Sequence, residues 1–442
     1  MIIGNGRLIT RDENNTFIEN GAVLIKGKLI KAVGTTEQLR KDYPGEEFID
    51  AYCGVIMPGM INTHNHIYSA LARGLSIKGY NPHNFIDILD GLWWTLDRKL
   101  TLEETRVSAE ATYIDCIKNG VTTIFDHHAS FGSIEGSLFE IAEAAKKYGI
   151  RSNLCYEVSD RDGKEKSLAS IKENADFIKY CQKDDSDMLK AMMGIHASFT
   201  VSDETFALCR KEMPDDVGFH VHVAEGIADL HMCLKDHGKR VVERLMDNGV
   251  LGSKTIAVHC VHINNAEIEM LKETDTMVVH NPESNMGNAV GCPPTLDIFN
   301  AGVLTGLGTD GYTNDMLESY KVANILHKHN KCMPNVAWGE IPAMLFENNA
   351  KIANRYFSTP LGMIKEGYSA DVVVTDYNPL TPMDGSNCNG HILFGMNGRS
   401  VVTTVAAGKL LMKDRELIGI DEAAVMAHAR EMAAKLAKDI NG

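Results

Sequence analysis

The feature that most constrains the fold is an alternation of short apolar runs with longer helical stretches, from residue 58 to about 355. The helical stretches are residues 102–119, 137–148, 164–181, 203–211 and 239–248. The short runs are 61–65, 122–125, 151–155, 190–195, 219–223, 255–258, 277–279 and 304–308. Strands that alternate with helices predict parallel β/α units. Eight of them over about 250 residues predict a (β/α)8 barrel, an α/β fold.

The two ends of the chain have the composition of β-structure instead. Residues 1–57 carry short apolar runs broken by Gly-containing turn signals, with one helix expected at 36–41. Apolar runs return at 370–376 and 401–412, before an Ala- and Met-rich helix at 421–439. Each end is too small to bury a core alone, so we expect both to pair into one small β-sandwich. The expected units are 1–57, 58–359 and 360–442.

Length and composition exclude several classes of protein. A chain of 442 residues, 44% hydrophobic and 23% charged, is typical of a globular protein with one large unit and a smaller one. The formal net charge of −15 argues against a nucleic-acid binder, which usually has a basic face. No apolar run approaches the ~20 residues that cross a bilayer, and the N-terminus shows no secretory signal. The ten cysteines are scattered without a Cys-x-x-Cys pair. We therefore expect a cytoplasmic protein without membrane or nucleic-acid partners.

Polar side chains end every expected barrel strand, where barrel enzymes carry their chemistry. The endings are His66, Asp126-His127-His128, Glu157, His196, His222, His259, His280-Asn281 and Asp310. In the first of them, His64 and His66 lie two residues apart on a strand, so both imidazoles project to one face. Two converging imidazoles are half of a divalent metal site. The sequence therefore predicts a metal site at the carboxyl ends of the strands.

Four ordered motifs carry a resemblance that covers the whole chain. They are Pro58-Gly59-x4-His64-x-His66, His222-Val223-Ala224-Glu225, His280-Asn281-Pro282-Glu283-Ser284-Asn285 and Gly308-Thr309-Asp310-Gly311. With them the sequence resembles the amidohydrolase superfamily, in the branch of guanine deaminase and the triazine hydrolases. Within that branch it is most similar to the aminohydrolase group called SsnA.

The resemblance implies a set of metal ligands: His64, His66, His222 and Asp310. His222 is preferred to its neighbour His220 because the family's catalytic Glu follows the ligand by three residues, as Glu225 does. Binuclear relatives carry a lysine at the end of the fourth strand, where this chain has His196. The resemblance therefore implies one divalent ion, zinc by expectation and Fe²⁺ as the alternative. Three imidazoles and a carboxylate with an open position suit zinc hydrolysis.

The same resemblance implies three catalytic residues for attack by a zinc-activated water. Asp310 would take the proton from the water. His259 would stabilise the attacking oxygen and the tetrahedral adduct. Glu225 would protonate a ring nitrogen and relay a proton to the departing amine.

The expected reaction is release of ammonia from a small, flat, neutral heterocycle that carries an amino group. Substrate contacts are expected from His196, Trp94, His128 and Asn281, with His127 as an alternative to His128. The roles of His127, His128, His220 and Glu157 stay open. The alternatives are hydrolysis of a cyclic amide or of a triazine-type bond and, less favoured, a scaffold without activity. Relatives are commonly homo-oligomers, so we expect a homo-oligomer.

Overall fold

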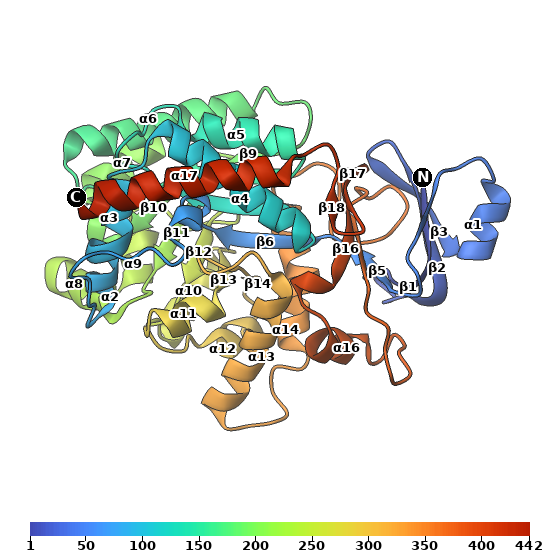
Figure 1. Cartoon of the computed structure of the whole chain (residues 1–442). Coiled ribbons are helices and arrows are strands. Elements are labelled where there is room, and N and C mark those ends of the chain that lie inside the picture. The colour runs from blue at the N-terminus through green and yellow to red at the C-terminus, as the bar shows by residue number, and fades with distance from the viewer.

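The protein is described by a computed structural model of residues 1–442. Its centre is built from parallel strands that form two sheets, ordered β6-β7-β8-β9 and β10-β11-β12-β13-β14 (Figure 1). Their bounds are β6 Met60–Asn65, β7 Val121–His128, β8 Arg151–Tyr156, β9 Leu189–Ala191, β10 Met193–Ala197, β11 Phe219–Val223, β12 Ile256–His259, β13 Met277–His280 and β14 Thr305–Leu307. All eight strands expected for the barrel are present and follow one another in chain order.

The two sheets meet at both edges. The fourth expected strand is interrupted at Met192, so that β9 pairs with β8 and β10 pairs with β11. An isolated parallel bridge between Val158 and Ile195 joins the sheets at this edge. At the other edge, Asn65 at the end of β6 forms a parallel bridge with Asp310 after β14. The backbone carbonyl of His64 accepts hydrogen bonds from the backbone N–H groups of Thr309 and Asp310. The α/β barrel fold expected from the sequence is therefore confirmed.

Helices follow the barrel strands and pack their apolar faces inward. In α5, Leu138, Ile141, Ala142 and Ala145 are buried at helical spacing, and Gly149 ends the helix with a φ of 76°. The helices between the strands are α4 Leu102–Lys118, α5 Ser137–Tyr148, α6 Lys164–Cys181, α7 Asp203–Glu212, α8 Ile227–His237, α9 Val241–Asp247, α10 Asn265–Glu273, α11 Pro282–Gly287 and α12 Thr295–Asn300. After β14 come α13 Met316–Lys331, α14 Glu340–Pro342, the π-helix η4 Ala343–Asn348, and α15 Asn349–Ala353.

Strands from both chain ends form one antiparallel-rich sheet beside the barrel. Its nine strands are β1 Ile2–Ile9, β2 Phe17–Lys26, β3 Leu29–Thr35, β4 Phe48–Asp50, β5 Val55–Pro58, β15 Val372–Thr375, β16 Val401–Ala406, β17 Lys409–Lys413 and β18 Glu416–Leu417. The two ends meet where β5 pairs with β15, with Met57 opposite Val373. Hydrogen bonds join all nine strands into one continuous sheet, with α1 (Thr36–Asp42) packed on β2 and β3.

The barrel and the sheet are tied by a buried ion pair. Arg151, at the start of β8, has Nη1 2.8 Å from Asp371 Oδ2, and both side chains are at most 5% exposed. Arg151 Nη2 also donates to Ser369 Oγ, and Asp371 Oδ1 accepts from the backbone N–H of Ala407. The pair thus holds β8 against the segment that leads into β15.

The C-terminal helix α17 (Glu422–Asn441) lies across α4 on the outside of the barrel (Figure 1). Its last residue, Asn441, accepts from the backbone N–H of Lys78 and donates to the carbonyl of Ser76. No helix is both long enough and apolar enough to cross a membrane. The remaining short helices are η1 Ile67–Ala72, α2 Phe85–Ile88, η2 Leu89–Trp93, α3 Trp94–Asp97, η3 Ser198–Thr200, α16 Cys388–Gly395 and η5 Gly398–Ser400.

Breaking the buried pair should destabilise the junction between barrel and sheet. We expect Asp371→Asn to lower the free energy of unfolding by about 3–5 kcal/mol, because Arg151 is left buried without its counter-charge. The measurement is urea unfolding, with Glu366→Gln as the control, since Glu366 pairs with Lys31 on the surface. The double variant Arg151→Met with Asp371→Asn should lose less free energy of unfolding than Asp371→Asn alone, because no unpaired charge stays buried. An Asp371→Asn protein that unfolds like the control would contradict this coupling.

Candidate metal centre and active site

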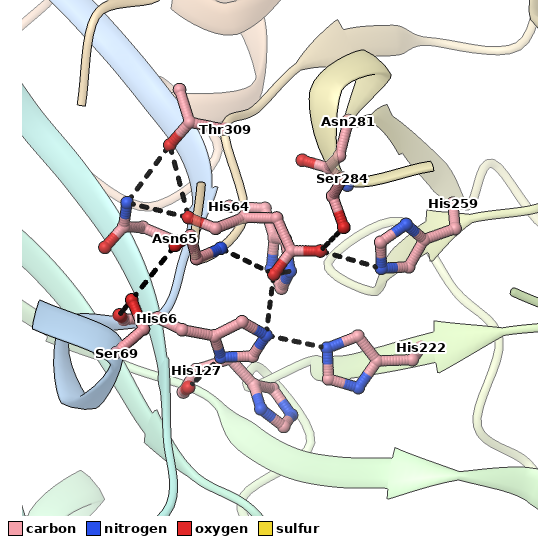
Figure 2. A network of polar contacts seen from close by, with 12 residues as sticks. His64, Asn65, His66, Ser69, His127, His222, His259, Asn281, Ser284 and Thr309 are labelled. Atoms are coloured by element: carbon pink, nitrogen blue, oxygen red, sulfur yellow. Dashed lines mark hydrogen bonds and ion pairs between the residues drawn. The ribbon is translucent and has the colours of Figure 1, made fainter. Parts of the chain in front are cut away.

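Three imidazoles and one carboxylate converge at the carboxyl ends of the barrel strands. His66 Nε2 lies 3.2 Å from His222 Nε2 and 3.1 Å from Asp310 Oδ1, and His64 Nε2 lies 3.8 Å from the same oxygen. His64 lies on β6 and His66 directly after it, His222 lies on β11, and Asp310 lies in the loop after β14. Figure 2 shows the rings of His64, His66 and His222 turned toward one place, with His259 beside them.

The other ring nitrogen of each histidine is held by the protein. His66 Nδ1 donates to the backbone carbonyl of His127 at 2.5 Å, and His222 Nδ1 donates to that of His196 at 2.8 Å. His64 Nδ1 lies 2.9 Å from Nε2 of His220, which is itself buried. Bonds at Nδ1 leave the lone pair on Nε2 and fix each ring in place, as around metal-ligating histidines. His220, whose role the sequence left open, therefore supports a ligand ring.

These residues fit a single divalent cation. A tetrahedral zinc ion with bonds of about 2.0–2.2 Å separates its ligand atoms by about 3.3–3.6 Å, close to the distances observed here. His64 Nε2 is buried and has no hydrogen-bond partner, so nothing in the protein satisfies its lone pair. His64, His66, His222 and Asp310 would hold the ion, and their three nitrogens and one oxygen are the donor set that zinc prefers.

A second group of side chains adjoins the ligands and can move protons. His259 Nε2 lies 3.3 Å from Glu225 Oε2 and 3.5 Å from Asp310 Oδ2. Asp310 Oδ2 also accepts from Ser284 Oγ at 2.6 Å. Burial, with the charge of Asp310, raises the pKa of Glu225 well above its usual range. Burial lowers the pKa of His259 to about 4. His259 is therefore a neutral ring at neutral pH, and Glu225 is more easily protonated than an exposed carboxyl group.

The backbone turns sharply at the strand ends that carry the candidate catalytic side chains. Ala224, His259 and Asp310 have φ values of 46°, 71° and 55°, in the left-handed region that side chains other than glycine rarely adopt. Strained residues of this kind cluster at functional sites. Gly308 is needed for close packing, because a Cβ there would lie 2.9 Å from His64 Cβ and 2.5 Å from Asn281 Oδ1.

A cavity opens from the ligands toward the helices η2 and α3. Of the expected substrate contacts, His196 and Trp94 line it, beside Glu157 and Glu225. His128 and Asn281 do not: both are fully buried, with His128 Nε2 bonded to Ser130 Oγ and Asn281 Nδ2 bonded to the Val279 carbonyl. No lysine or arginine lines the cavity.

Several cavity residues are not among the four substrate contacts expected from the sequence. They are Tyr68, Phe85, Leu89, Trp93, Ser284, Asn288 and Tyr312. Ser284 and Asn288 lie four residues apart on and just after α11, and Asn288 Nδ2 donates to Glu225 Oε1 at 3.3 Å. The only sequence signal that Ser284 and Asn288 lie on one face of a helix is their spacing of four residues after β13. Tyr312 comes from the loop after Asp310, where the sequence shows no periodicity.

The comparisons with known proteins decide the family. The model of the amidohydrolase family matches residues 55–411, which is most of the chain. The chain belongs to the amidohydrolase family. A second model, of a bacterial imidazolonepropionase-like composite domain, matches residues 21–45 in the sheet.

Curated relatives are similar over nearly the whole length. The chain is 32% identical to the 5'-deoxyadenosine deaminase of Methanosarcina barkeri, over 100% of this chain and 99% of the relative. It is 32% identical to the 5-methylthioadenosine/S-adenosylhomocysteine deaminase of Thermococcus onnurineus, over 94% of this chain and 95% of the relative. The amidohydrolase fold is shared with a zinc-bound adenosine deaminase from Xanthomonas campestris, with a TM-score of 0.83, 22% identity and 98% of each chain covered.

The contact between His220 and His64 predicts an effect on metal binding. We expect His220→Phe to weaken the affinity for zinc by about 10–100-fold, because the ring of His64 loses the bond that orients it. The affinity is measured by competition with a chelator. His128→Phe is the control, since His128 is equally buried but its Nε2 bonds Ser130. Equal zinc affinities of the two variants would show that the contact between His220 and His64 does not contribute to metal binding.

Proposed function

We propose that the protein is a metal-dependent aminohydrolase that releases ammonia from a neutral, amino-substituted purine or a similar heterocycle. The observation that carries this proposal is geometric: Glu225 and Asp310 both lie beside His259, next to four side chains that fit a zinc ion. The enzyme class is that of hydrolases acting on carbon–nitrogen bonds other than peptide bonds. The deaminase relatives support the same reaction type.

The proposed chemistry divides proton transfer between two carboxyl groups. Zinc in this position would supply hydroxide from water near neutral pH. Asp310 takes the proton that the attacking water gives up. Glu225 donates its proton to the ring nitrogen beside the attacked carbon, which makes that carbon more electrophilic. A carbon–oxygen bond forms, the hydroxyl proton of the adduct passes through Glu225 to the amine, and the carbon–nitrogen bond breaks with loss of ammonia. The proton held by Asp310 then restores Glu225.

His259 is suited to hold the attacking oxygen. Asn285 Nδ2 donates to His259 Nδ1 at 2.9 Å, so the ring carries its own proton on Nε2. That proton faces the space between Glu225 and Asp310, where oxygen would add to the ring. A neutral donor aimed at a developing negative charge stabilises the tetrahedral adduct.

The lining of the cavity supports a neutral substrate. It offers ring faces at Trp93 and Trp94, and acceptors at Glu157 and His196, without a cation that would bind a phosphate. Adenine nucleosides without a phosphate meet this description, because the base is flat and the ribose hydroxyls are donors. They are also the substrates named for the relatives, so they are the first compounds to test.

We also propose one zinc ion per chain, with iron as the alternative, a homo-oligomer, and a cytoplasmic location. The single ion is supported by the end of the fourth strand, Ile195-His196-Ala197, which brings no lysine to bridge two ions. The location is supported by the ten cysteines, none of which is in a disulfide.

Glu225 should be needed for turnover but not for metal binding. We expect Glu225→Gln to lower kcat by about 10²-fold or more, because the amide keeps the shape and cannot relay a proton. The zinc content of the variant, measured by elemental analysis, should equal that of the wild type. Parallel loss of zinc and rate would place Glu225 among the ligands.

A screen for ammonia release tests the substrate class. We expect zinc-loaded protein to deaminate 5'-deoxyadenosine or adenosine with kcat/KM of about 10⁴ M⁻¹s⁻¹ or above, and guanine or a nucleotide far more slowly. Glu225→Gln is the matched control for contaminating activity. Efficient deamination of guanine would contradict the substrate assignment. If no amino heterocycle released ammonia but a cyclic amide was hydrolysed, the protein would be a cyclic-amide hydrolase instead of a deaminase.

A further inference from the structure

A second cavity lies away from the metal centre and contains a buried cation. It has a volume of about 220 Å³ and shares no lining residue with the catalytic cavity. Three parts of the chain enclose it: the β1–β2 connection, the segment α14–η4, and the start of α16, with α14 and α16 neighbours in Figure 1. The lining residues are Ile9, Arg11, Asn15, Phe17, Gly339, Pro342, Ala343, Glu347, Gly385, Cys388 and Asn389.

Arg11 is the buried charged residue of this cavity, and its guanidinium has no hydrogen-bond partner. The residue is 8% exposed, and its Nε and Nη2 are buried without a hydrogen-bond partner. The guanidinium carbon lies 3.8 Å from the centre of the Phe346 ring, so one face of the group is stacked. Stacking of this kind leaves the N–H groups free in the plane of the guanidinium.

The surroundings of Arg11 compensate its charge only in part, through the charge of Glu347. Burial lowers the pKa of Arg11, yet an arginine side chain stays protonated in proteins. Glu347 lines the same cavity but is exposed and forms no hydrogen bond with Arg11. The side-chain oxygen of Asn389 is also buried without a partner. A buried charge without a counter-charge destabilises a fold, and an anion in the cavity would remove that penalty.

We propose that this cavity is a binding site for a small oxyanion, a carboxylate or a phosphate, held by Arg11. The planar guanidinium matches both groups, since two parallel N–H bonds can reach two oxygens. A cavity of about 220 Å³ is several times the ~30 Å³ of one water, which leaves room for an anion of that size. The site joins residues from both ends of the chain to η4, so an anion there would bridge the sheet and the barrel.

The test is calorimetric binding of two probes, inorganic phosphate and acetate, to the zinc-loaded full chain at constant ionic strength in sodium chloride. We expect saturable binding of at least one probe, and the comparison of the two tells which oxyanion the site prefers. Arg11→Met should weaken that binding by at least about 10-fold, because a charge-assisted hydrogen bond is lost. Arg40→Met is the control, since Arg40 also stacks on a phenylalanine, Phe48, but is exposed.

A second variant keeps the proposal testable if Arg11→Met does not fold. Glu347→Gln removes the acidic group at the cavity and changes only an exposed side chain. It should strengthen anion binding, because a like charge is removed. If Glu347 were instead the partner of Arg11, the variant would melt at a lower temperature and gain no affinity. Three outcomes would overturn the proposal. The first is this lower melting temperature of Glu347→Gln without a gain in affinity. The others are equal anion binding by Arg11→Met and wild type, and no saturable binding of either probe.

Discussion

The site depends on one electrostatic constraint: a group of buried lone pairs that face one another. His64 and His66 turn Nε2 toward the carboxylate of Asp310, and His222 Nε2 lies beside that of His66, while Nδ1 of each ring is occupied elsewhere. Acceptors held this close, out of water and without donors between them, repel one another unless a cation lies among them. The carboxyl ends of parallel strands are where a barrel can bring such groups together. The rest of the catalytic arrangement is built around that cation position.

The polar network around His64, His66, His222 and Asp310 connects the proposed metal position with the proposed proton-transfer groups. Asp310 has one oxygen toward His66 and the other toward Ser284 and His259, so it links the metal position to the proton-transfer group. Glu225 follows His222 by three residues through a turn at Ala224, which brings ligand and acid from one strand end.

The sequence predicted those parts of the site that depend on short spacing. The pair His64–His66, and the choice of His222 by its distance from Glu225, needed only strand alternation and a motif. On β7, alternation implies that His127 and His128 point to opposite sides, but not which one faces the ligands. The barrel packing decides that: the ring of His127 lies 4.5 Å from that of His222, whereas His128 faces Tyr156. Residues such as Tyr312, or the contact of His220 with His64, depend on tertiary packing that no local pattern encodes.

The most direct measurement is anomalous diffraction at the zinc absorption edge from crystals of zinc-loaded protein. We expect one strong peak per chain, about 2.0–2.2 Å from Nε2 of His64, His66 and His222 and from a carboxylate oxygen of Asp310. A second peak of equal strength, or a single peak between Glu157 and His196, would contradict it.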